Sequence, residues 1–212
     1  QTNQRTKATR MDSEFWNNRY RESDRVWSGE PNPQLLAEAD RLAPGRALDA
    51  GCGEGADAIW LARRGWTVTA VDFAQAALDK GRAEAERQGC AAAIDWVCQD
   101  LTGWQPDEEF DLVSAQFFHV EPSFRDKTVR HLANAVMAGG SLLVVGHNRE
   151  DLRTHAGHER HAETLFDPED IERLLDEADW SIAVSEARQR VVRTAEGQPF
   201  NYTDTVVRAV RR

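Results

Sequence analysis

The sequence lacks several features that would define other classes of protein. It has only three cysteines and no apolar secretion-signal core near its start, so we expect free thiols rather than a disulfide framework. No apolar run approaches the ~18 residues that a membrane span needs. The formal net charge of −10 argues against nucleic acid or an anionic membrane as the main partner, because phosphate groups bind to basic surfaces. We therefore expect a cytoplasmic protein with neither partner.

The length and composition fit one α/β domain. The chain has 212 residues, of which 41% are hydrophobic and 29% are charged, enough for a core of its own. Residues 1–10 are polar and without periodicity, and are expected to be a disordered tail or a remnant of expression. Residues 11–212 are predicted to form a single domain, with a helical cap over 11–45 and an α/β core over 46–212.

Predicted strands and helices alternate after residue 45, which is typical of a parallel sheet with helices on both faces. Two strands close the chain, and their short connection requires them to be antiparallel. The prediction is a doubly wound, seven-stranded, mostly parallel sheet with an antiparallel C-terminal strand and an N-terminal helical cap. The predicted strands are 46–50, 67–72, 94–100, 110–117, 141–148, 181–192 and 201–211; the predicted helices are 11–22, 33–42, 56–65, 74–89, 122–140 and 167–179.

A glycine-rich turn follows the first of these strands. Gly51, Gly53 and Gly55 stand at alternate positions between a strand and an amphipathic helix. Glycine is needed where the backbone turns sharply or where a ligand approaches too closely for a Cβ atom. The spacing predicts a loop that holds a nucleotide-like ligand against backbone N–H groups. Asp72 ends the next strand, where an acid can accept both hydroxyls of a ribose.

The glycine spacing alone leaves the ligand open. Read as Gly51-x-Gly53-x-x-Ala56, it also matches a dinucleotide-binding fingerprint. However, Asp49 would repel a pyrophosphate and would suit a cationic amine. S-adenosylmethionine combines a ribose with an ammonium group, so it is the favoured ligand. An NAD(P)-binding oxidoreductase and a non-enzymatic S-adenosylmethionine-binding protein remain as alternatives, although the oxidoreductase's Tyr-x-x-x-Lys is not found.

From about residue 46 onward the chain resembles the class I S-adenosylmethionine-dependent methyltransferases. The segment VWSGEPN at 26–32 resembles the N-terminal segment of tellurite-resistance and thiopurine methyltransferases. The resemblance implies a Rossmann-like methyltransferase fold, S-adenosylmethionine as cofactor and S-adenosylhomocysteine as product. The cofactor-binding residues it implies are Trp27, Asp49, Gly51, Cys52, Gly53, Gly55, Asp72, Phe73, Asp100, Leu101, Gln116 and Phe117.

The resemblance also implies a role for each part of this set. Asp49 and the Gly51 backbone lie beside the methionine portion, and Asp72 accepts the ribose hydroxyls. Asp100 accepts the adenine amine, and the Leu101 N–H donates to the adenine ring.

The remaining aromatic and amide side chains complete the expected site. Phe73 packs on the adenine face, and Gln116 and Phe117 border the sulfonium and its methyl group. Trp27 covers the sulfonium through a cation–π contact.

Methyl transfer is an in-line displacement, so the protein mainly aligns the reactants and excludes water. A base is needed only if the acceptor loses a proton, and His119 and His147 are the candidates, each just beyond a predicted strand. We expect a small, partly aromatic or anionic acceptor, with a protein side chain as the second possibility, and a monomer or homodimer. No metal is predicted; the histidines at 155–161 are expected to belong to a polar lid or to the acceptor pocket.

Overall fold

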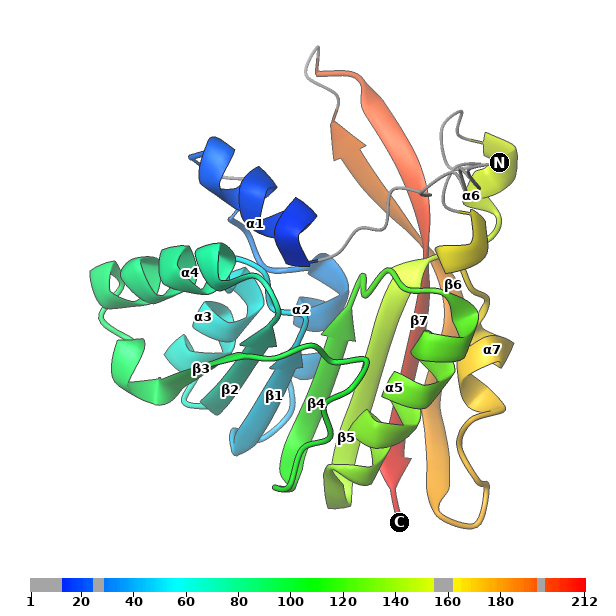
Figure 1. Ribbon diagram of the computed structural model, residues 1–212. Coiled ribbons are helices and arrows are strands. Elements are labelled where there is room, and N and C mark those ends of the chain that lie inside the picture. Colours follow the sequence, from blue (N-terminus) through cyan, green and yellow to red (C-terminus); the bar gives the residue numbers. More distant parts are fainter. Residues whose placement is uncertain (1–12, 25–28, 155–161, 194–196) are drawn as a thin grey trace, which may run out of the picture.

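A seven-stranded sheet runs through the computed structural model, which describes residues 13–24, 29–154, 162–193 and 197–212 (Figure 1). Its strand order is β3-β2-β1-β4-β5-β7-β6, and β7 runs in the direction opposite to the other six strands. This confirms the predicted fold class. The strands are β1 Arg46–Ala50, β2 Thr67–Asp72, β3 Ile94–Cys98, β4 Phe110–Gln116, β5 Val136–His147, β6 Trp180–Arg193 and β7 Pro199–Arg211.

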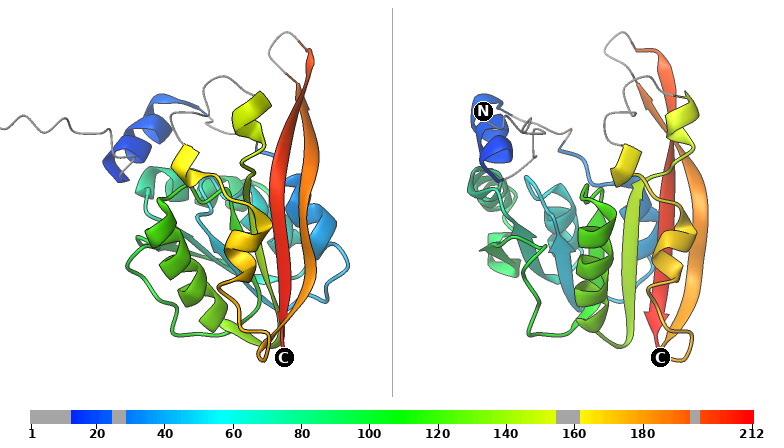
Figure 2. Two further views of the ribbon diagram at one scale, coloured as in Figure 1. Left: turned by 90° about the vertical axis from the view of Figure 1, so that its right-hand side faces the viewer. Right: turned by 45° about the vertical axis from the view of Figure 1, so that its right-hand side comes forward.

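Helices cover both faces of the sheet. Alternate strand residues point to opposite sides, so Leu142 and Val144 of β5 join one apolar cluster while Leu143 and Val145 join the other. Side chains of α5 and α7 pack in the first cluster, and those of α2 and α3 pack in the second. In Figure 2, α5 and α7 lie on one side of the sheet and α2 lies on the other. The helices are α1 Ser13–Glu22, α2 Pro33–Ala39, α3 Ala56–Arg63, α4 Gln75–Arg87, α5 Pro122–Asn134, α6 Asp151–Thr154 and α7 Pro168–Glu172, with a short 3-10 helix η1 at Ala91–Ala93.

The helices predicted over 122–140 and 167–179 exceed the observed ones by the largest margins. The helix predicted over 122–140 ends at Asn134, because the following residues enter β5 and pair with the start of β4. A Cβ atom at Gly140 would lie 2.9–3.0 Å from three backbone oxygens, so the chain is pressed against its neighbours there. The helix predicted over 167–179 is α7, which ends at Glu172. The chain then continues in turns, in which the N–H groups of Leu174 and Leu175 donate to carbonyl groups three residues earlier.

The last two strands form a hairpin that extends beyond the rest of the sheet (Figure 1). Pairing of β5 with β7 ends at His147 opposite Asp204, whereas β6 and β7 stay paired as far as Arg193 opposite Pro199. The outer part of this hairpin therefore stands above the edge at which the parallel strands end. Ligands of open α/β sheets bind at that edge.

The N-terminal helix α1 packs on α4 near the same edge (Figure 1). Tyr20 is buried against Ala74 and Ala77, and the Asn17 side-chain oxygen accepts the N–H of Ala76 at 3.0 Å. Residues 1–10 lie outside the described residues, so the prediction made for them is untested.

The glycine turn depends on the absence of a side chain at Gly55. Its φ is +79°, and a Cβ atom would lie 2.3 Å from the Trp96 ring. We expect Gly55→Ala to lower the free energy of unfolding by about 1–3 kcal/mol, through overpacking and left-handed backbone strain. Urea unfolding measures the effect. Gly103→Ala is the matched control, since nothing lies within 4 Å of that position; equal stability of the two variants would contradict the packing argument.

Candidate functional site

A cavity of about 1490 Å³ opens at the carboxyl ends of β1, β2, β4 and β5. All of the predicted cofactor residues that the structure describes line it, and so do His119 and His147. Residues from α1, from the segment before α2 and from the outer part of the hairpin complete its wall. Trp27 and the histidines at 155–161 fall outside the described residues, so the predictions for them stay predictions.

Backbone hydrogen bonds fix the glycine turn at the centre of this cavity. The N–H groups of Gly51 and Cys52 both donate to the Val71 carbonyl, at 2.8 and 3.0 Å. The turn is therefore tied to β2 before the chain enters α3. Gly51, Gly53 and Gly55 all have positive φ.

Asp72 joins the glycine turn to the start of α4. Its Oδ2 accepts the N–H of Gly53 and its Oδ1 accepts the N–H of Ala74, both at 2.9 Å. Burial raises the pKa of this carboxyl, and the backbone N–H groups oppose the rise. Each carboxylate oxygen can accept more than one hydrogen bond, so Asp72 can hold the turn and still accept from a ligand.

Asp49 is 2% exposed, and its Oδ2 has no hydrogen-bond partner within the described parts of the chain. Burial raises the pKa of Asp49 well above its usual range, and the nearby Asp57 and Asp72 raise it further. Such a group favours a cationic partner, which would restore the ionised form. The attraction of Asp49 for an amine stays a prediction, which the lack of a partner for Oδ2 in the described residues supports.

Asp57 lines the cavity as well, although no role was predicted for it from the sequence. Asp57 accepts hydrogen bonds from the backbone N–H and the side-chain Nδ2 of Asn32, at 2.7 and 2.8 Å. Burial raises its pKa. The only available signal was an acid in the first turn of the helix after the glycines, a position that favours acids in any helix.

Asp100 lies two residues beyond β3, because that strand ends at Cys98 rather than at residue 100 as predicted. Its Oδ1 accepts the N–H and the hydroxyl of Thr102, at 2.9 and 2.7 Å, which shapes the turn after the strand. Leu101 is buried beside it, and both residues line the cavity with Phe73.

At the opposite end of the cavity Phe117 adopts a φ of +53°, which is rare for a bulky residue. Its N–H donates to the Val145 carbonyl at 2.7 Å, which fixes the chain where β4 ends. Next to it, Gln116 donates to Ser114 at 3.0 Å, while its Oε1 is buried without a hydrogen-bond partner among the described residues. Strained residues of this kind cluster at binding sites.

The two histidines lie together at this end. Their rings stack with centroids 5.3 Å apart and planes 10° apart. His147 also lies near Phe117, with ring centroids 4.9 Å apart. The fully buried Asp151 places Oδ2 3.9 Å from Nδ1 of His147 and accepts the N–H of Thr203 through Oδ1.

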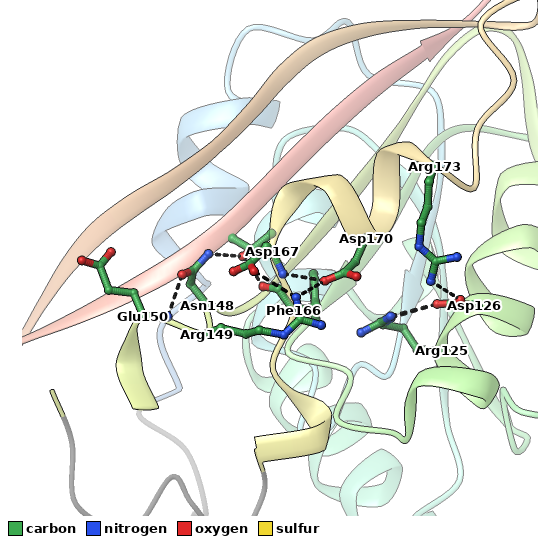
Figure 3. Close-up of polar contacts among 10 residues, drawn as sticks. Arg125, Asp126, Asn148, Arg149, Glu150, Phe166, Asp167, Asp170 and Arg173 are labelled. Atoms are coloured by element: carbon green, nitrogen blue, oxygen red, sulfur yellow. Dashed lines mark hydrogen bonds and ion pairs between the residues drawn. The ribbon is translucent and has the colours of Figure 1, made fainter. Parts of the chain in front are cut away.

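The segment that carries His147 is held by a polar network (Figure 3). Asn148 donates to the Thr205 hydroxyl at 2.9 Å and accepts the N–H of Glu150 at 2.9 Å. The N–H of Phe166 donates to the His147 carbonyl at 3.2 Å. The network continues to the start of α7, where Arg149 pairs with Asp167 and Asp170.

Arg190 and Tyr202 of the hairpin also line the cavity, and the sequence did not single them out. Asp204, which is fully buried, accepts Nε and Nη2 of Arg190 at 2.7 and 3.1 Å. The guanidinium Cζ lies 5.2 Å from the Phe117 ring centroid and 5.3 Å from that of Tyr202.

The described residues contain no group of three or more His, Cys, Asp or Glu side chains that could hold a metal ion. The helices in this described part of the chain are too short or too polar to span a bilayer.

Comparisons with known proteins identify the family to which the chain belongs. A family model for a methyltransferase domain matches residues 47–140. An uncharacterized methyltransferase of Mycobacterium bovis is 32% identical over 139 residues, which cover 64% of this chain and 68% of that protein. The chain belongs to the class I S-adenosylmethionine-dependent methyltransferases.

Other similarities concern only part of a relative or the fold. A probable thiol methyltransferase of Arabidopsis thaliana is 28% identical over 121 residues, or 55% of this chain and 54% of that protein; the chain thus spans about half its length. The N-methyltransferase NodS of Bradyrhizobium japonicum, solved with S-adenosylhomocysteine, has a TM-score of 0.70 at 18% identity and covers 94% of this chain and 98% of its own. That likeness shows a shared fold.

The buried position of Asp49 generates a stability prediction. A carboxyl group whose pKa is raised in the folded state lowers the free energy of unfolding at pH values above that pKa. The lost stability returns as the pH falls below the folded pKa and the group becomes protonated. We expect Asp49→Asn to stabilise the unliganded protein by about 1–3 kcal/mol at pH 8, with a gain that shrinks toward pH 5. Thermal unfolding across this pH range measures the gain. Asp95→Asn, on an exposed position of β3, is the control; a gain independent of pH would contradict the argument.

Proposed function

We propose that this chain transfers the methyl group of S-adenosylmethionine to a small-molecule acceptor. The observation that carries the proposal is the buried Asp49, whose Oδ2 has no hydrogen-bond partner among the described residues and which shares one cavity with Asp72 and Asp100. The ammonium, ribose and adenine of S-adenosylmethionine present hydrogen-bond donors, and these three carboxylates are acceptors.

The residues present fit the cofactor. Asp49 would hold the ammonium, Asp72 the ribose hydroxyls, and Asp100 the adenine amine. The turn at Gly51 lets the backbone approach the methionine portion, since no Cβ atom stands in the way. NodS, which shares this fold, is known with S-adenosylhomocysteine bound.

The chain's own residues would then align the acceptor and exclude water. S-adenosylmethionine supplies an electrophilic methyl group, so no dedicated electrophilic catalyst is required. Gln116 and Phe117 lie where β4 ends, at the border between the acidic and aromatic parts of the cavity. His147, with the Asp151 carboxylate behind it, is the favoured base for an acceptor that loses a proton. His119 stacks on its ring as the second candidate.

Two alternatives are less well supported. An NAD(P)-binding oxidoreductase would place a pyrophosphate beside the buried acids Asp49, Asp57 and Asp72, at a high electrostatic cost. A non-enzymatic binding protein needs room for one ligand, whereas typical ligand pockets measure roughly 300–1000 Å³. The cavity of about 1490 Å³ leaves space for an acceptor as well.

A small molecule is the favoured acceptor. The acidic net charge of −10 opposes nucleic acid, and the Arabidopsis thaliana relative is a probable thiol methyltransferase. The three cysteines are free thiols in the structure, which supports a reducing compartment such as the cytoplasm.

Asp72 provides the test of cofactor binding. We expect micromolar binding of S-adenosylmethionine and S-adenosylhomocysteine by isothermal titration calorimetry, and none of NADH. Asp72→Ala should abolish the binding of S-adenosylmethionine and S-adenosylhomocysteine. This variant loses the acceptor for the ribose hydroxyls and the hydrogen bond that shapes the glycine turn. Asp72→Asn keeps one acceptor oxygen and should weaken binding less. Asp95→Ala is the control. Unchanged affinity in Asp72→Ala would contradict the ribose assignment.

His147 provides the test of proton removal. In a screen of thiols and phenols with radiolabelled S-adenosylmethionine, we expect His147→Ala to lower the transfer rate about 100-fold or more. Its affinity for S-adenosylhomocysteine should not change, because the side chain serves the acceptor. His131→Ala, on α5 and outside the cavity wall, is the control. A weaker cofactor affinity with an unchanged rate would reverse the assignment.

A further inference from the structure

The carboxylates that line the cavity are unevenly distributed along it. Its cofactor end contains the carboxylates of Asp49, Asp57, Asp72 and Asp100. Among the described residues that line the other end, from Gln116 onward in the sequence, there is no carboxylate. We call this other end the acceptor end; its polar side chains include Arg190 and the two histidines, and its walls are otherwise mostly aromatic.

Arg190 is fixed in place as the cation of the acceptor end. Nε and Nη2 of Arg190 donate hydrogen bonds to the Asp204 carboxylate, so this edge of the guanidinium group is occupied. Asp204 is held in turn by Nε2 of Gln34 at 3.1 Å. Nη1 of Arg190 makes no hydrogen bond to any described residue, and it is left for a ligand that accepts hydrogen bonds.

Aromatic rings connect Arg190 with His147. Phe117 lies 4.9 Å from the His147 ring and 5.2 Å from the guanidinium Cζ. Tyr202 lies 5.5 Å from the same ring and 5.3 Å from the same Cζ. Phe117 and Tyr202 therefore each lie beside both Arg190 and His147. Flat walls of this kind favour a planar ligand, because aromatic rings stack or meet edge to face.

Resting on the proposed function, we propose that the acceptor is a planar aromatic molecule with an acidic hydroxyl or thiol on its ring, and that Arg190 determines this specificity. Nη1 of Arg190 binds the phenolate or thiophenolate, and His147 receives the proton. The heteroatom forms a bond to the methyl carbon while the carbon–sulfur bond of the sulfonium breaks. The electron pair of that bond stays on sulfur, giving a neutral thioether, and His147 releases its proton to solvent.

A binding experiment with 4-nitrophenol tests this without knowledge of the natural acceptor. The protein is saturated with S-adenosylhomocysteine and titrated with 4-nitrophenol, or with nitrobenzene as the neutral analogue. We expect at least tenfold tighter binding of 4-nitrophenol, with the phenolate absorption band appearing at a lower pH than in free solution. A hydrogen bond to a charged group is worth about that factor.

Variants of the hairpin locate the effect. Arg190→Gln should remove the preference and the shift of the band, and Arg190→Lys should keep part of both. Arg190→Gln leaves the buried Asp204 carboxylate short of hydrogen-bond donors. The double variant Arg190→Gln with Asp204→Asn removes that buried charge as well. It should lose the preference for 4-nitrophenol to the same extent. Arg193→Gln is the matched control, since Arg193 is exposed on the same strand and outside the cavity wall.

The possible failures are distinguishable. Equal binding of 4-nitrophenol and nitrobenzene, or tighter binding of benzylamine than of either, would overturn the acceptor class. A retained preference in the double variant would overturn the role of Arg190. Absence of S-adenosylhomocysteine binding in the unaltered protein would overturn the proposed function itself.

Discussion

Buried carboxylates that must find hydrogen-bond donors organise this molecule around its cavity. A buried carboxylate without donors is costly, and Asp57, Asp72 and Asp204 each draw their donors from other parts of the chain. Asp72 accepts hydrogen bonds from backbone N–H groups in the turns after β1 and β2. Asp57 accepts hydrogen bonds from the backbone and the side chain of Asn32. Asp204 takes Arg190 of β6 and Gln34 of α2. The positions of the turns and of the hairpin follow from these bonds.

The segment that begins at Asn32 connects the two ends of the cavity. Asn32 is bonded to Asp57 at the start of α3, beside the glycine turn. Two residues later, Gln34 is bonded to Asp204, which holds Arg190. One short stretch at the start of α2 therefore supports the cofactor end through one side chain and the acceptor end through another. A displacement of this stretch would affect both ends together.

The fold class and the placement of the predicted site residues around one cavity depend on local signals in the sequence. Gly51 and Asp72 stand at strand ends, and parallel topology alone brings such positions to one edge of a sheet. Helix ends were less well predicted, because the stop at Asn134 depends on the pairing of β5 with a distant strand. Arg190 was not predicted, because an arginine in an alternating strand looks like a solvent-facing residue. Its place in the cavity depends on a hairpin longer than its neighbours, which only the folded pairing shows.

The uneven distribution of carboxylates among the described residues of the cavity shows how an acidic chain could accommodate the proposed anionic acceptor. A carboxylate exposed at the acceptor end would repel such an acceptor, and the low polarity of a buried site would strengthen the repulsion. Two acids do lie near this end, but Asp204 and Asp151 are fully buried behind Arg190 and His147. Each one orients its partner and is shielded from the cavity by it. The ligand therefore meets the donors first, although the chain as a whole carries a net charge of −10.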